Sequence, residues 1–162
     1  MTQQGKIGAD FGCKRGQRGL RADFQVREDF VPLAITALYA GILAFIAFGL
    51  AANVGWRRPG LGIAIGDGGN EALMVANRRH MNFVEHAPLA LILIAIVELN
   101  GAPSVWVHSL GGTLVIARIV HPFGIHAKTL GHPARAIGAM LTMAATIAAA
   151  VLAIMQHFHA FP

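Results

Sequence analysis

The sequence predicts an all-α integral membrane protein, built as an up-down bundle of four helices that cross the bilayer. Two observations support this fold class. Hydrophobic residues make up 55% of the 162 residues and charged residues only 13%, whereas about 25% of a typical soluble domain is charged. The apolar residues also gather into four long stretches, and a helix needs roughly 20 of them to cross the bilayer core. The chain is long enough for one such domain and too short for two.

The composition also excludes other classes of protein. The net charge is +5, but the basic residues are too few and too scattered to follow a phosphate backbone, so we expect no nucleic-acid partner. The single cysteine, Cys13, allows neither an intramolecular disulfide nor a paired metal or redox motif. Residues 60–70 are rich in glycine, but no strand pattern precedes them and their spacing differs from a dinucleotide-binding fingerprint. We interpret them as a loop.

The first two spans have clear boundaries in the sequence. The first is expected at residues 31–54, whose only ionisable side chain is Tyr39. We expect this helix to end at WRRP, residues 56–59, where an aromatic interface residue and two cations precede a helix breaker. The second begins after Asn70, a suitable N-cap residue, and ends at ELNGAP, residues 98–103, a typical helix stop.

The third span is expected at residues 104–126, and the fourth at residues 134–157 after Pro133. The connecting loops are short, so each helix should run antiparallel to its neighbour in the sequence. Small residues such as those at 138–139 and 144–145 allow membrane helices to approach closely. The four-span domain is therefore expected at residues 31–158.

Charge in the loops predicts the orientation. The loop between the second and third spans, residues 99–105, has no Lys or Arg. The other two loops and their helix margins carry Arg57, Arg58, Arg78, Arg79, Lys128 and Arg135. The positive-inside rule then places the first and third loops in the cytoplasm and both termini outside. A bacterial inner membrane and an organelle membrane both fit, and we adopt the former as the prediction.

Residues 1–30 contradict this orientation, because they carry six Lys and Arg residues. They lack the apolar core of a signal peptide. The segment is polar, glycine-rich and without periodicity, so we expect it to be disordered. One explanation is that it is not native, for instance upstream DNA translated from a wrong start codon. The alternative is a cytoplasmic basic arm that faces anionic lipids.

Polar side chains inside the predicted spans form two helical faces. Arg78, Asn82 and Glu85 lie at i, i+4 and i+7, within a ~60° sector of the second helix. Arg118 and His121 lie at i and i+3 of the third helix. A charged group costs at least ~2.5 kcal/mol at the bilayer centre, so such groups normally face the bundle interior. We expect the two faces to converge in one polar pocket.

The charges in this predicted pocket do not balance. Arg135, in the first turn of the fourth helix, adds a third arginine at a helix end that already favours an anion. One interpretation is structural, with Arg78 or Arg118 paired to Glu85. The other is a binding site, because three arginines and one carboxylate leave positive charge that an anionic ligand would neutralise. We interpret Arg79 as an interface residue that reaches lipid phosphates.

A metal site is not predicted. The histidines at 121, 126 and 132 are candidate ligands, but the only helical partner of His121 is a cation, Arg118, which opposes metal binding.

Three motifs carry a resemblance to a known family. Residues 78–85, RRHMNFVE, followed by Pro88, resemble the R-x-x-x-N-x-x-E signature of the MAPEG family, the membrane-associated proteins of eicosanoid and glutathione metabolism. Residues 117–121, ARIVH, match the family's A-R-x-x-H element, and residues 133–136, PARA, match its P-x-R-[AS] element. The family includes microsomal glutathione transferases and microsomal prostaglandin E synthase. The resemblance covers about residues 31–158.

This resemblance implies a homotrimer that binds glutathione between neighbouring subunits near the cytoplasmic face. The residues that match the family's glutathione contacts are Arg78, Asn82, Glu85, His121 and Arg135. A basic residue at the end of the first helix, Arg57 or Arg58, is implied as a further contact. From its place on the polar face of the third helix, we expect Arg118 to belong to a supporting polar network. Arg135 is also implied to stabilise the glutathione thiolate. The implied partners are the lipid bilayer and a hydrophobic electrophile that the sequence does not identify.

The chemistry of glutathione agrees with the surplus of positive charge. Glutathione has two carboxylates and one ammonium, so arginines are suited to its carboxylates and Glu85 to its ammonium. Three positions depart from the family pattern. Ile125 and Ala139 stand where tyrosine is frequent, and Ala136 stands where some members have serine. Two functions therefore remain open: a membrane glutathione transferase or peroxidase, and a non-enzymatic protein that binds glutathione, another anion or lipid head groups.

Overall fold

The computed structural model describes residues 33–129 and 131–160, with side chains up to Phe158. The described chain folds into four helices: α2 (Ala34–Leu61), α3 (Glu71–Leu99), α4 (Ser104–Phe123) and α5 (Pro133–Ala160). The prediction that residues 1–30 form a disordered or non-native extension lies outside the described residues.

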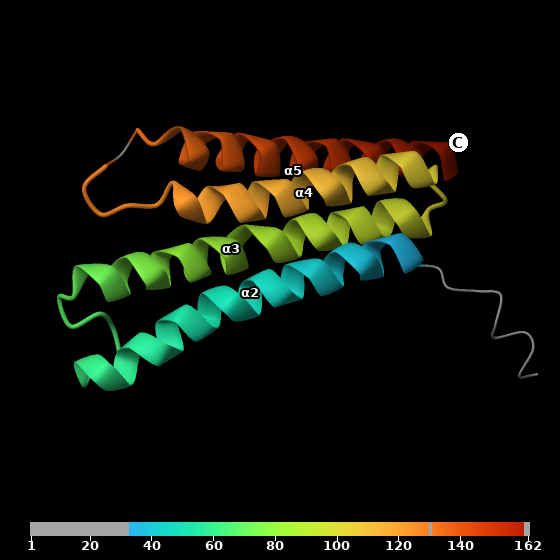
Figure 1. The fold of residues 1–162 in the computed structure, drawn as a ribbon. Helices are drawn as coiled ribbons and strands as arrows, with labels where there is room; N and C mark the ends of the chain where they lie inside the picture. The colour runs from blue at the N-terminus through green and yellow to red at the C-terminus, as the bar shows by residue number, and fades with distance from the viewer. Residues whose placement is uncertain (1–32, 130, 161–162) are drawn as a thin grey trace, which may run out of the picture. The chain divides into compact units, whose positions relative to one another are not determined.

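The four helices run up and down, each antiparallel to its neighbour in the sequence (Figure 1). The α2–α3 and α4–α5 loops lie at one end of the bundle, which we call the loop end. The start of α2, the α3–α4 turn and the end of α5 lie at the other. Helices α3 and α4 pack against each other, and each also packs against α2 and α5. In the described part of the chain α2 and α5 do not contact each other. The predicted all-α up-down bundle is confirmed.

The prediction of four membrane-spanning helices is only partly confirmed. By length and composition, three described helices are candidate membrane spans: α2, α3 and α5 as far as Phe158. The fourth, α4, is not among them. It has 20 residues and includes polar side chains such as His108, Arg118 and His121, which lower its hydropathy. Helix α4 packs against α2, α3 and α5. These contacts hold it in the bundle although its hydropathy is lower than that of the three candidate spans.

The predicted end of the first helix is wrong. Helix α2 continues through the WRRP sequence and ends at Leu61, with Pro59 inside its last turns. A proline removes only one backbone donor, so a helix can continue for a few residues beyond it. The stop comes from Gly62, whose left-handed backbone (φ 66°) allows two terminal hydrogen bonds. Its own N–H donates to the Pro59 carbonyl at 3.2 Å, and the Ile63 N–H donates to the Arg58 carbonyl at 3.3 Å.

The other helix boundaries lie nearer to the prediction. The Asn70 side chain caps α3 by accepting the Leu73 N–H at 3.0 Å, as its place in the sequence suggested. Helix α4 ends at Phe123 rather than at residue 126, with Pro122 in its last turn and Gly124 following it. Helix α5 starts at Pro133, where the missing N–H of proline costs nothing.

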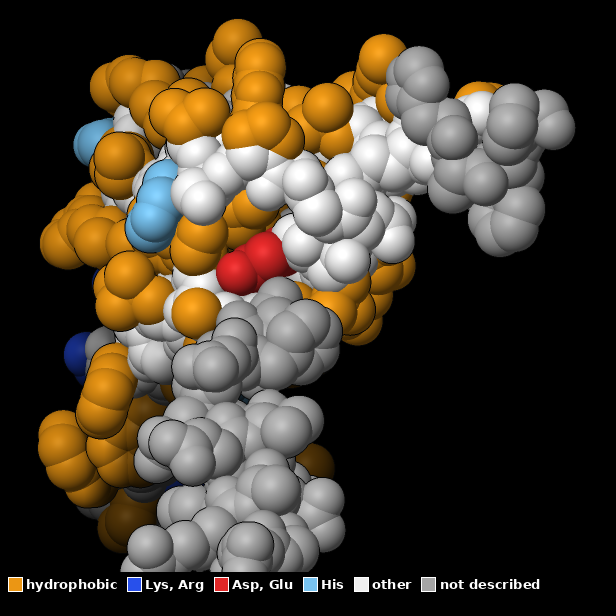
Figure 2. Space-filling view, turned by 90° about the vertical axis from the view of Figure 1, so that its right-hand side faces the viewer, with side chains coloured by type: hydrophobic (Ala, Val, Ile, Leu, Met, Phe, Trp, Pro, Cys, Tyr) orange, Lys and Arg blue, Asp and Glu red, His pale blue; other side chains and the backbone are white. Residues whose placement is uncertain are grey.

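The main apolar cluster of the core lies where the four helices meet, and buried polar side chains, Arg118 and Thr142 among them, lie elsewhere in the interior. The buried members of this cluster are Leu43, Phe83, Ala87, Ala90, Ile94, Val107, Leu110, Leu114 and Ala149. Many other large apolar side chains are exposed, including Phe45 and Phe48 on α2 and Met140 on α5. In Figure 2, which views the end opposite the loop end, hydrophobic side chains surround the described part of the bundle and few basic ones are visible. An apolar exterior of this kind is suited to contact with lipid.

Glycines bring two helix pairs into close contact. A Cβ atom at Gly138 would lie 2.6 Å from the Cβ of His121, so α5 lies against α4 at this point. A Cβ at Gly111 would overlap the ring of Tyr39, which lies against α4 in the same way. The close approach predicted for residues 138–139 is therefore confirmed at Gly138. The tight α4–α5 contact matters because both helices carry residues of the predicted site.

Candidate functional site

A cavity of about 520 Å³ opens near the loop end, between α3, the end of α4 and the start of α5. This volume is within the range of roughly 300–1,000 Å³ that is typical of small-molecule sites. Its lining includes four of the predicted site residues: Arg78, Asn82, His121 and Arg135. The rest of the lining is Met74, Val75, Asn77, Met81, Ile125, His126, Ala127 and Ala139. Ile125 and Ala139, which replace the tyrosines frequent in the resembled family, thus face the same cavity.

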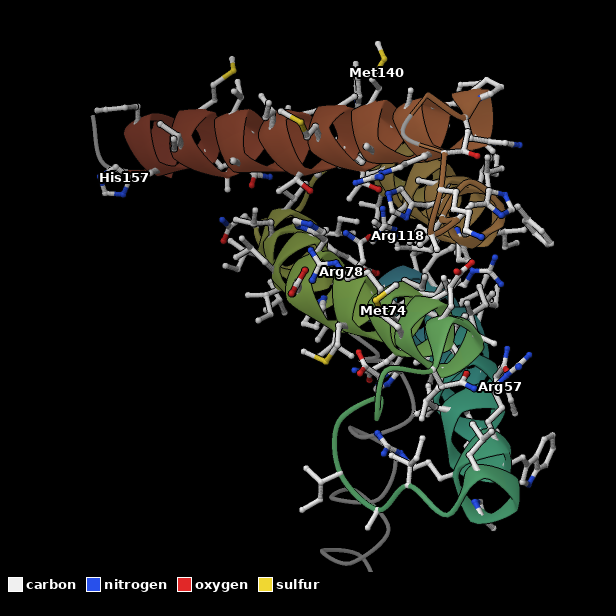
Figure 3. The ribbon with its side chains drawn as sticks, turned by 90° about the vertical axis from the view of Figure 1, so that its left-hand side faces the viewer. Arg57, Met74, Arg78, Arg118, Met140 and His157 are labelled. Atoms are coloured by element: carbon white, nitrogen blue, oxygen red, sulfur yellow. The ribbon has the colours of Figure 1, made fainter. Side chains whose placement is uncertain are left out.

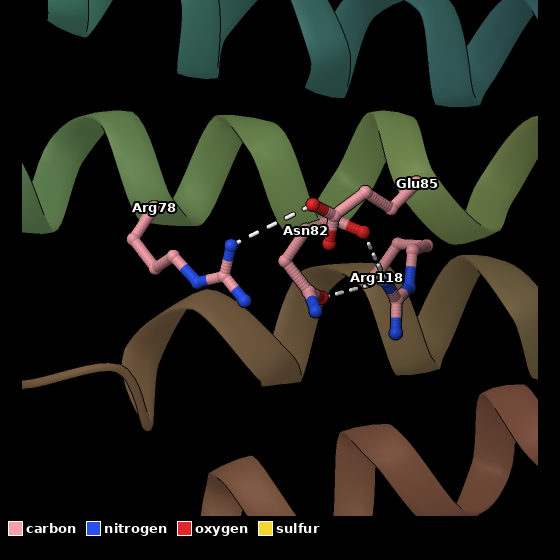
Figure 4. A network of polar contacts seen from close by, with 4 residues as sticks. All are labelled: Arg78, Asn82, Glu85 and Arg118. Atoms are coloured by element: carbon pink, nitrogen blue, oxygen red, sulfur yellow. Dashed lines mark hydrogen bonds and ion pairs between the residues drawn. The ribbon is translucent and has the colours of Figure 1, made fainter. Parts of the chain in front are cut away.

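The side chain of Arg118 lies behind this cavity and links three helices (Figures 3 and 4). It is only 2% exposed. Its Nη1 donates to the side-chain oxygen of Asn82 at 3.2 Å and to the carbonyl of the same residue at 3.4 Å. Its Nη2 donates to the Thr142 hydroxyl and to the Gly138 carbonyl at 3.5 Å. Every acceptor is neutral, so among the described residues this buried cation has no carboxylate partner.

Arg78 and Glu85 form an ion pair on the outer face of α3, with 3.5 Å between Nη1 and Oε1 (Figure 4). Their side chains are 64% and 42% exposed. The structural interpretation, in which Glu85 pairs with Arg78 or Arg118, is thus met for Arg78 alone. The expectation that all the charged groups face the bundle interior is wrong for this pair. On this face of α3, Asn82 contacts Arg118 of α4. Arg78 and Glu85 lie on the same face but remain at the surface of the single chain.

Close packing of the α4–α5 loop brings His121 and Arg135 to the same cavity. A Cβ atom at Gly124 would lie 2.7 Å from the Cβ of Arg135, so the chain leaving α4 passes directly beside the first turn of α5. His121 is 5% exposed, whereas Arg135 is exposed. Arg135 projects from the N-terminal turn of α5, where unpaired backbone N–H groups add partial positive charge.

Arg57 and Arg58 do not line this cavity in the same chain. Arg57 lies on α2, away from Arg78 and Arg118 (Figure 3), and its Nε donates to the Asn53 side chain at 2.7 Å. Arg58 turns toward the α2–α3 loop, where Nη1 donates to the carbonyls of Ala64 at 3.2 Å and Gly66 at 3.0 Å. Arg58 therefore holds the loop, which sequence spacing did not indicate.

Arg79 does not reach outward as predicted. It is half-buried, and its Nη2 donates to the Ile125 carbonyl at 2.9 Å, which ties α3 to the segment after α4. The reason is local, because α4 ends early and leaves the Ile125 carbonyl free for a side-chain donor. Among the described residues, no three His, Cys, Asp or Glu side chains lie close enough together to hold a metal ion.

Comparison with known proteins agrees with this arrangement. The sequence profile of the MAPEG family matches residues 36–155, which include all four helices up to Met155 of α5. The chain belongs to the MAPEG family. It is also similar to the inner membrane protein YecN of Escherichia coli strain K12, with 36% identity over 94 residues, 58% of this chain and 72% of that protein. The YecN protein of the E. coli O6:H1 strain CFT073 aligns to the same extent. No solved structure matches the chain significantly.

Membership of the MAPEG family confirms the resemblance drawn from the three motifs. Together with the similarity to an inner membrane protein and the three candidate spans, it identifies the chain as an integral membrane protein. The motifs of this MAPEG protein meet around one cavity: the first lies on α3, the second at the end of α4 and the third at the start of α5.

Sequence reasoning missed Thr142, whose hydroxyl contacts the buried guanidinium of Arg118. The signal was present but weak. Thr142 lies seven residues after Arg135 and four after Gly138, so all three share one face of α5. A threonine inside an apolar helix is more often explained by a bond to its own backbone, and Thr142 also makes one, to the Gly138 carbonyl at 2.8 Å.

The charges around the cavity are suited to an anion. Arg78 and Arg135 line it, Arg118 lies behind it, and Glu85 is the single carboxylate of this group. In a membrane protein an uncompensated cation is costly, and a bound anion would neutralise it.

Proposed function

We propose that this MAPEG protein is a membrane-bound glutathione transferase or peroxidase, which activates the thiol of glutathione for attack on hydrophobic electrophiles. The observation that supports it is the cavity near the loop end, where positively charged side chains outnumber carboxylates. Glutathione is a net anion with one ammonium, so it offers the charges that this lining lacks.

In this proposal each polar residue has a separate task. The guanidiniums of Arg78 and Arg135 bind the glutathione carboxylates, because a planar guanidinium donates two parallel hydrogen bonds to a carboxylate. Glu85 binds the ammonium and exchanges part of its ion pair with Arg78 for it. Asn82 is held by Arg118, which leaves its amide N–H group for the peptide backbone of the ligand. His121 contributes a ring nitrogen from the wall of the cavity.

The nucleophile is the sulfur of the bound glutathione rather than a protein side chain. A free thiol has a pKa near 8.5, so only a few per cent is ionised at neutral pH, and a nearby cation increases that fraction. Arg135 is the proposed source, since a guanidinium and the N-terminus of α5 act together there. The thiol releases its proton to water, and the thiolate sulfur then bonds to the electrophilic atom while the leaving group departs with its electron pair.

The proposed assembly is the homotrimer that the family resemblance implies. The exposure of Arg78, Glu85 and Arg135 in the single chain supports it, because a second copy would cover this face and exclude water from the bound thiol. Arg57 belongs to the glutathione site only if α2 of one copy approaches the cavity of another. We further propose a bacterial inner membrane, with the two loops of the loop end in the cytoplasm.

The alternative is a non-enzymatic protein that binds glutathione, another anion or lipid head groups without turnover. Ile125 and Ala139 favour it, since both line the cavity and neither offers a hydroxyl to the sulfur. The two functions differ in whether the bound thiol ionises.

The test is a titration of glutathione into the purified protein in detergent at neutral pH, followed by the ultraviolet absorbance of the thiolate. The proposal expects a saturable thiolate signal that Arg135→Ala abolishes and Arg135→Lys partly keeps. Ala136→Ser is the matched gain-of-function variant, since it restores a hydroxyl beside Arg135 and should increase the signal. Saturable binding without thiolate would favour the non-enzymatic alternative. Absence of binding would refute the transferase and leave only a non-enzymatic protein whose arginines bind another anion or lipid head groups.

A further inference from the structure

A second groove, of about 570 Å³, lies beside the glutathione cavity at the loop end. Residues of α2, of the first turns of α3 and of the α4–α5 loop line it. Its lining consists of Asn53, Arg57, Glu71, Ala72, Val75, Ala76, Arg79, His126, Ala127, Lys128, Thr129 and His132. Of the proposed glutathione contacts only Arg57 is among them. We call this space the basic groove.

The charge of the basic groove is strongly unbalanced. Arg57, Arg79 and Lys128 face one carboxylate, Glu71. Glu71 lies 3.7 Å from the Lys128 ammonium, and the two side chains are 57% and 85% exposed, so water screens the pair and Lys128 remains available to a ligand. Two positive charges are left over near a membrane surface.

The two arginines are held in place with donors to spare. Arg57 is fixed through Nε by the Asn53 side chain, and its terminal nitrogens make no hydrogen bond within the described residues. Arg79 is fixed through Nη2 by the Ile125 carbonyl. Its Nε is buried and has no hydrogen-bond partner among the described residues. A buried donor without an acceptor costs free energy, which an oxygen-rich ligand would recover.

The position of the groove relative to the membrane indicates the source of its ligand. The groove lies at the end of two candidate spans, α2 and α3. Trp56, the residue before Arg57, is 83% exposed, and exposed tryptophans at helix ends typically lie at the level of the lipid headgroups. The histidine rings of His126 and His132, whose centroids are 5.2 Å apart, complete the polar wall on the loop side.

We propose that the basic groove binds a phosphate group, carried either by the headgroup of a membrane phospholipid or by a soluble compound. Phosphate has three or more acceptor oxygens, which suit the separate donors of Arg57, Arg79 and Lys128. The groove and the glutathione cavity share the wall formed by Val75, His126 and Ala127, but the phosphate site does not require glutathione chemistry.

The test uses the full chain in detergent after removal of lipid, with Trp106→Phe so that Trp56 alone reports binding by fluorescence. The probes are short-chain phosphatidylglycerol, short-chain diacylglycerol without phosphate, and inorganic phosphate. The proposal expects saturable binding of phosphatidylglycerol, of inorganic phosphate or of both, and none of diacylglycerol. Saturation by phosphatidylglycerol at lower concentration than phosphate identifies a lipid headgroup as the source, and the reverse identifies a soluble compound. Binding of diacylglycerol equal to that of phosphatidylglycerol would overturn the proposal.

Two adjacent arginines provide a matched control. Arg57→Gln removes a donor from the groove, whereas Arg58→Gln removes the same charge one residue away, where it holds loop carbonyls. The dissociation constant for the phosphate probe should rise about tenfold in Arg57→Gln, the loss of one hydrogen bond to a charged group. It should rise less than about twofold in Arg58→Gln, since screened surface charges contribute little. Equal losses would mean general surface attraction and would refute the groove.

Two further variants keep the result interpretable. Arg79→Gln should also weaken phosphate binding, and Lys128→Gln protects the test if Arg79→Gln fails to fold. Lys128→Gln removes an exposed loop cation and only its screened pair with Glu71, and should likewise weaken phosphate binding. A parallel glutathione titration separates the two sites. Weaker glutathione binding in Arg57→Gln with unchanged phosphate binding would overturn the phosphate site and assign Arg57 to glutathione instead.

Discussion

Replacing Thr142 by valine tests the link between α4 and α5 with little change in volume. The Thr142 hydroxyl accepts a hydrogen bond from Nη2 of the buried Arg118. The other acceptor of this nitrogen, the Gly138 carbonyl, lies 3.5 Å from it. Valine fills the space of the threonine, so the change removes the hydroxyl without opening a cavity. The change removes the hydrogen bond from a guanidinium that is 2% exposed. It also removes the bond that the same hydroxyl donates to the Gly138 carbonyl at 2.8 Å.

The magnitude follows from that contact. A hydrogen bond to a charged group contributes about 1.5–3 kcal/mol in soluble proteins, while interhelical bonds within membranes average about 0.6 and reach about 1.7 kcal/mol. Because the guanidinium is deeply buried and its Nε has no hydrogen-bond partner among the described residues, we expect a loss near the upper end of the membrane range, about 1.5 kcal/mol.

The assay is the free energy of unfolding in mixed detergent micelles, measured for a double-mutant cycle. Its four proteins are the parent, Thr142→Val, Arg118→Met and the double variant. In the Arg118→Met background the hydroxyl has no cation to accept from, so adding Thr142→Val should cost almost nothing. The coupling energy between the two positions is then about 1.5 kcal/mol.

Thr146 offers a control one turn further along α5. Its hydroxyl donates to the Thr142 carbonyl at 2.8 Å, the same backbone bond that Thr142 makes to Gly138, but it does not contact Arg118. Thr146→Val should change stability by less than about 0.5 kcal/mol. Our reasoning is refuted if Thr142→Val costs the same with and without Arg118, or if the two threonines behave alike.

Three other variants test the packing and the capping of the helices. Gly138→Ala should destabilise the protein by about 1–3 kcal/mol, because its Cβ would overlap that of His121. Gly49→Ala in α2 meets no atom within 4 Å and should stabilise the protein by up to about 1 kcal/mol. Thermal unfolding that ranks the two variants the other way would contradict this packing. Glu98→Gln should lower the free energy of unfolding by about 1 kcal/mol. The Glu98 carboxylate accepts hydrogen bonds from the backbone N–H groups at the start of α2, including that of Thr36 at 2.7 Å. Unchanged unfolding by denaturant would show that the charge of this cap is unimportant.

The candidate site divides into what helical periodicity predicts and what it does not. Spacing of four and three residues places Arg78, Asn82 and Glu85 on one face of α3, and the structure keeps them there. Spacing does not tell which part of that face a neighbouring helix covers. Arg78 and Glu85 therefore proved exposed, while Arg118 of α4 proved buried with neutral acceptors only.

Four helices, their order and the end of the bundle at which the polar motifs meet could be predicted from the amino-acid sequence. Hydropathy and short loops depend only on residues near one another in the chain, so they are readable without coordinates. The tertiary structure alone decided the partners of Arg57, Arg58 and Arg79. These long side chains can reach several acceptors, and the choice depends on which carbonyls the packed loops leave free. It also decided that the cations divide between two cavities, since that division requires α2, α3 and the α4–α5 loop to be packed together.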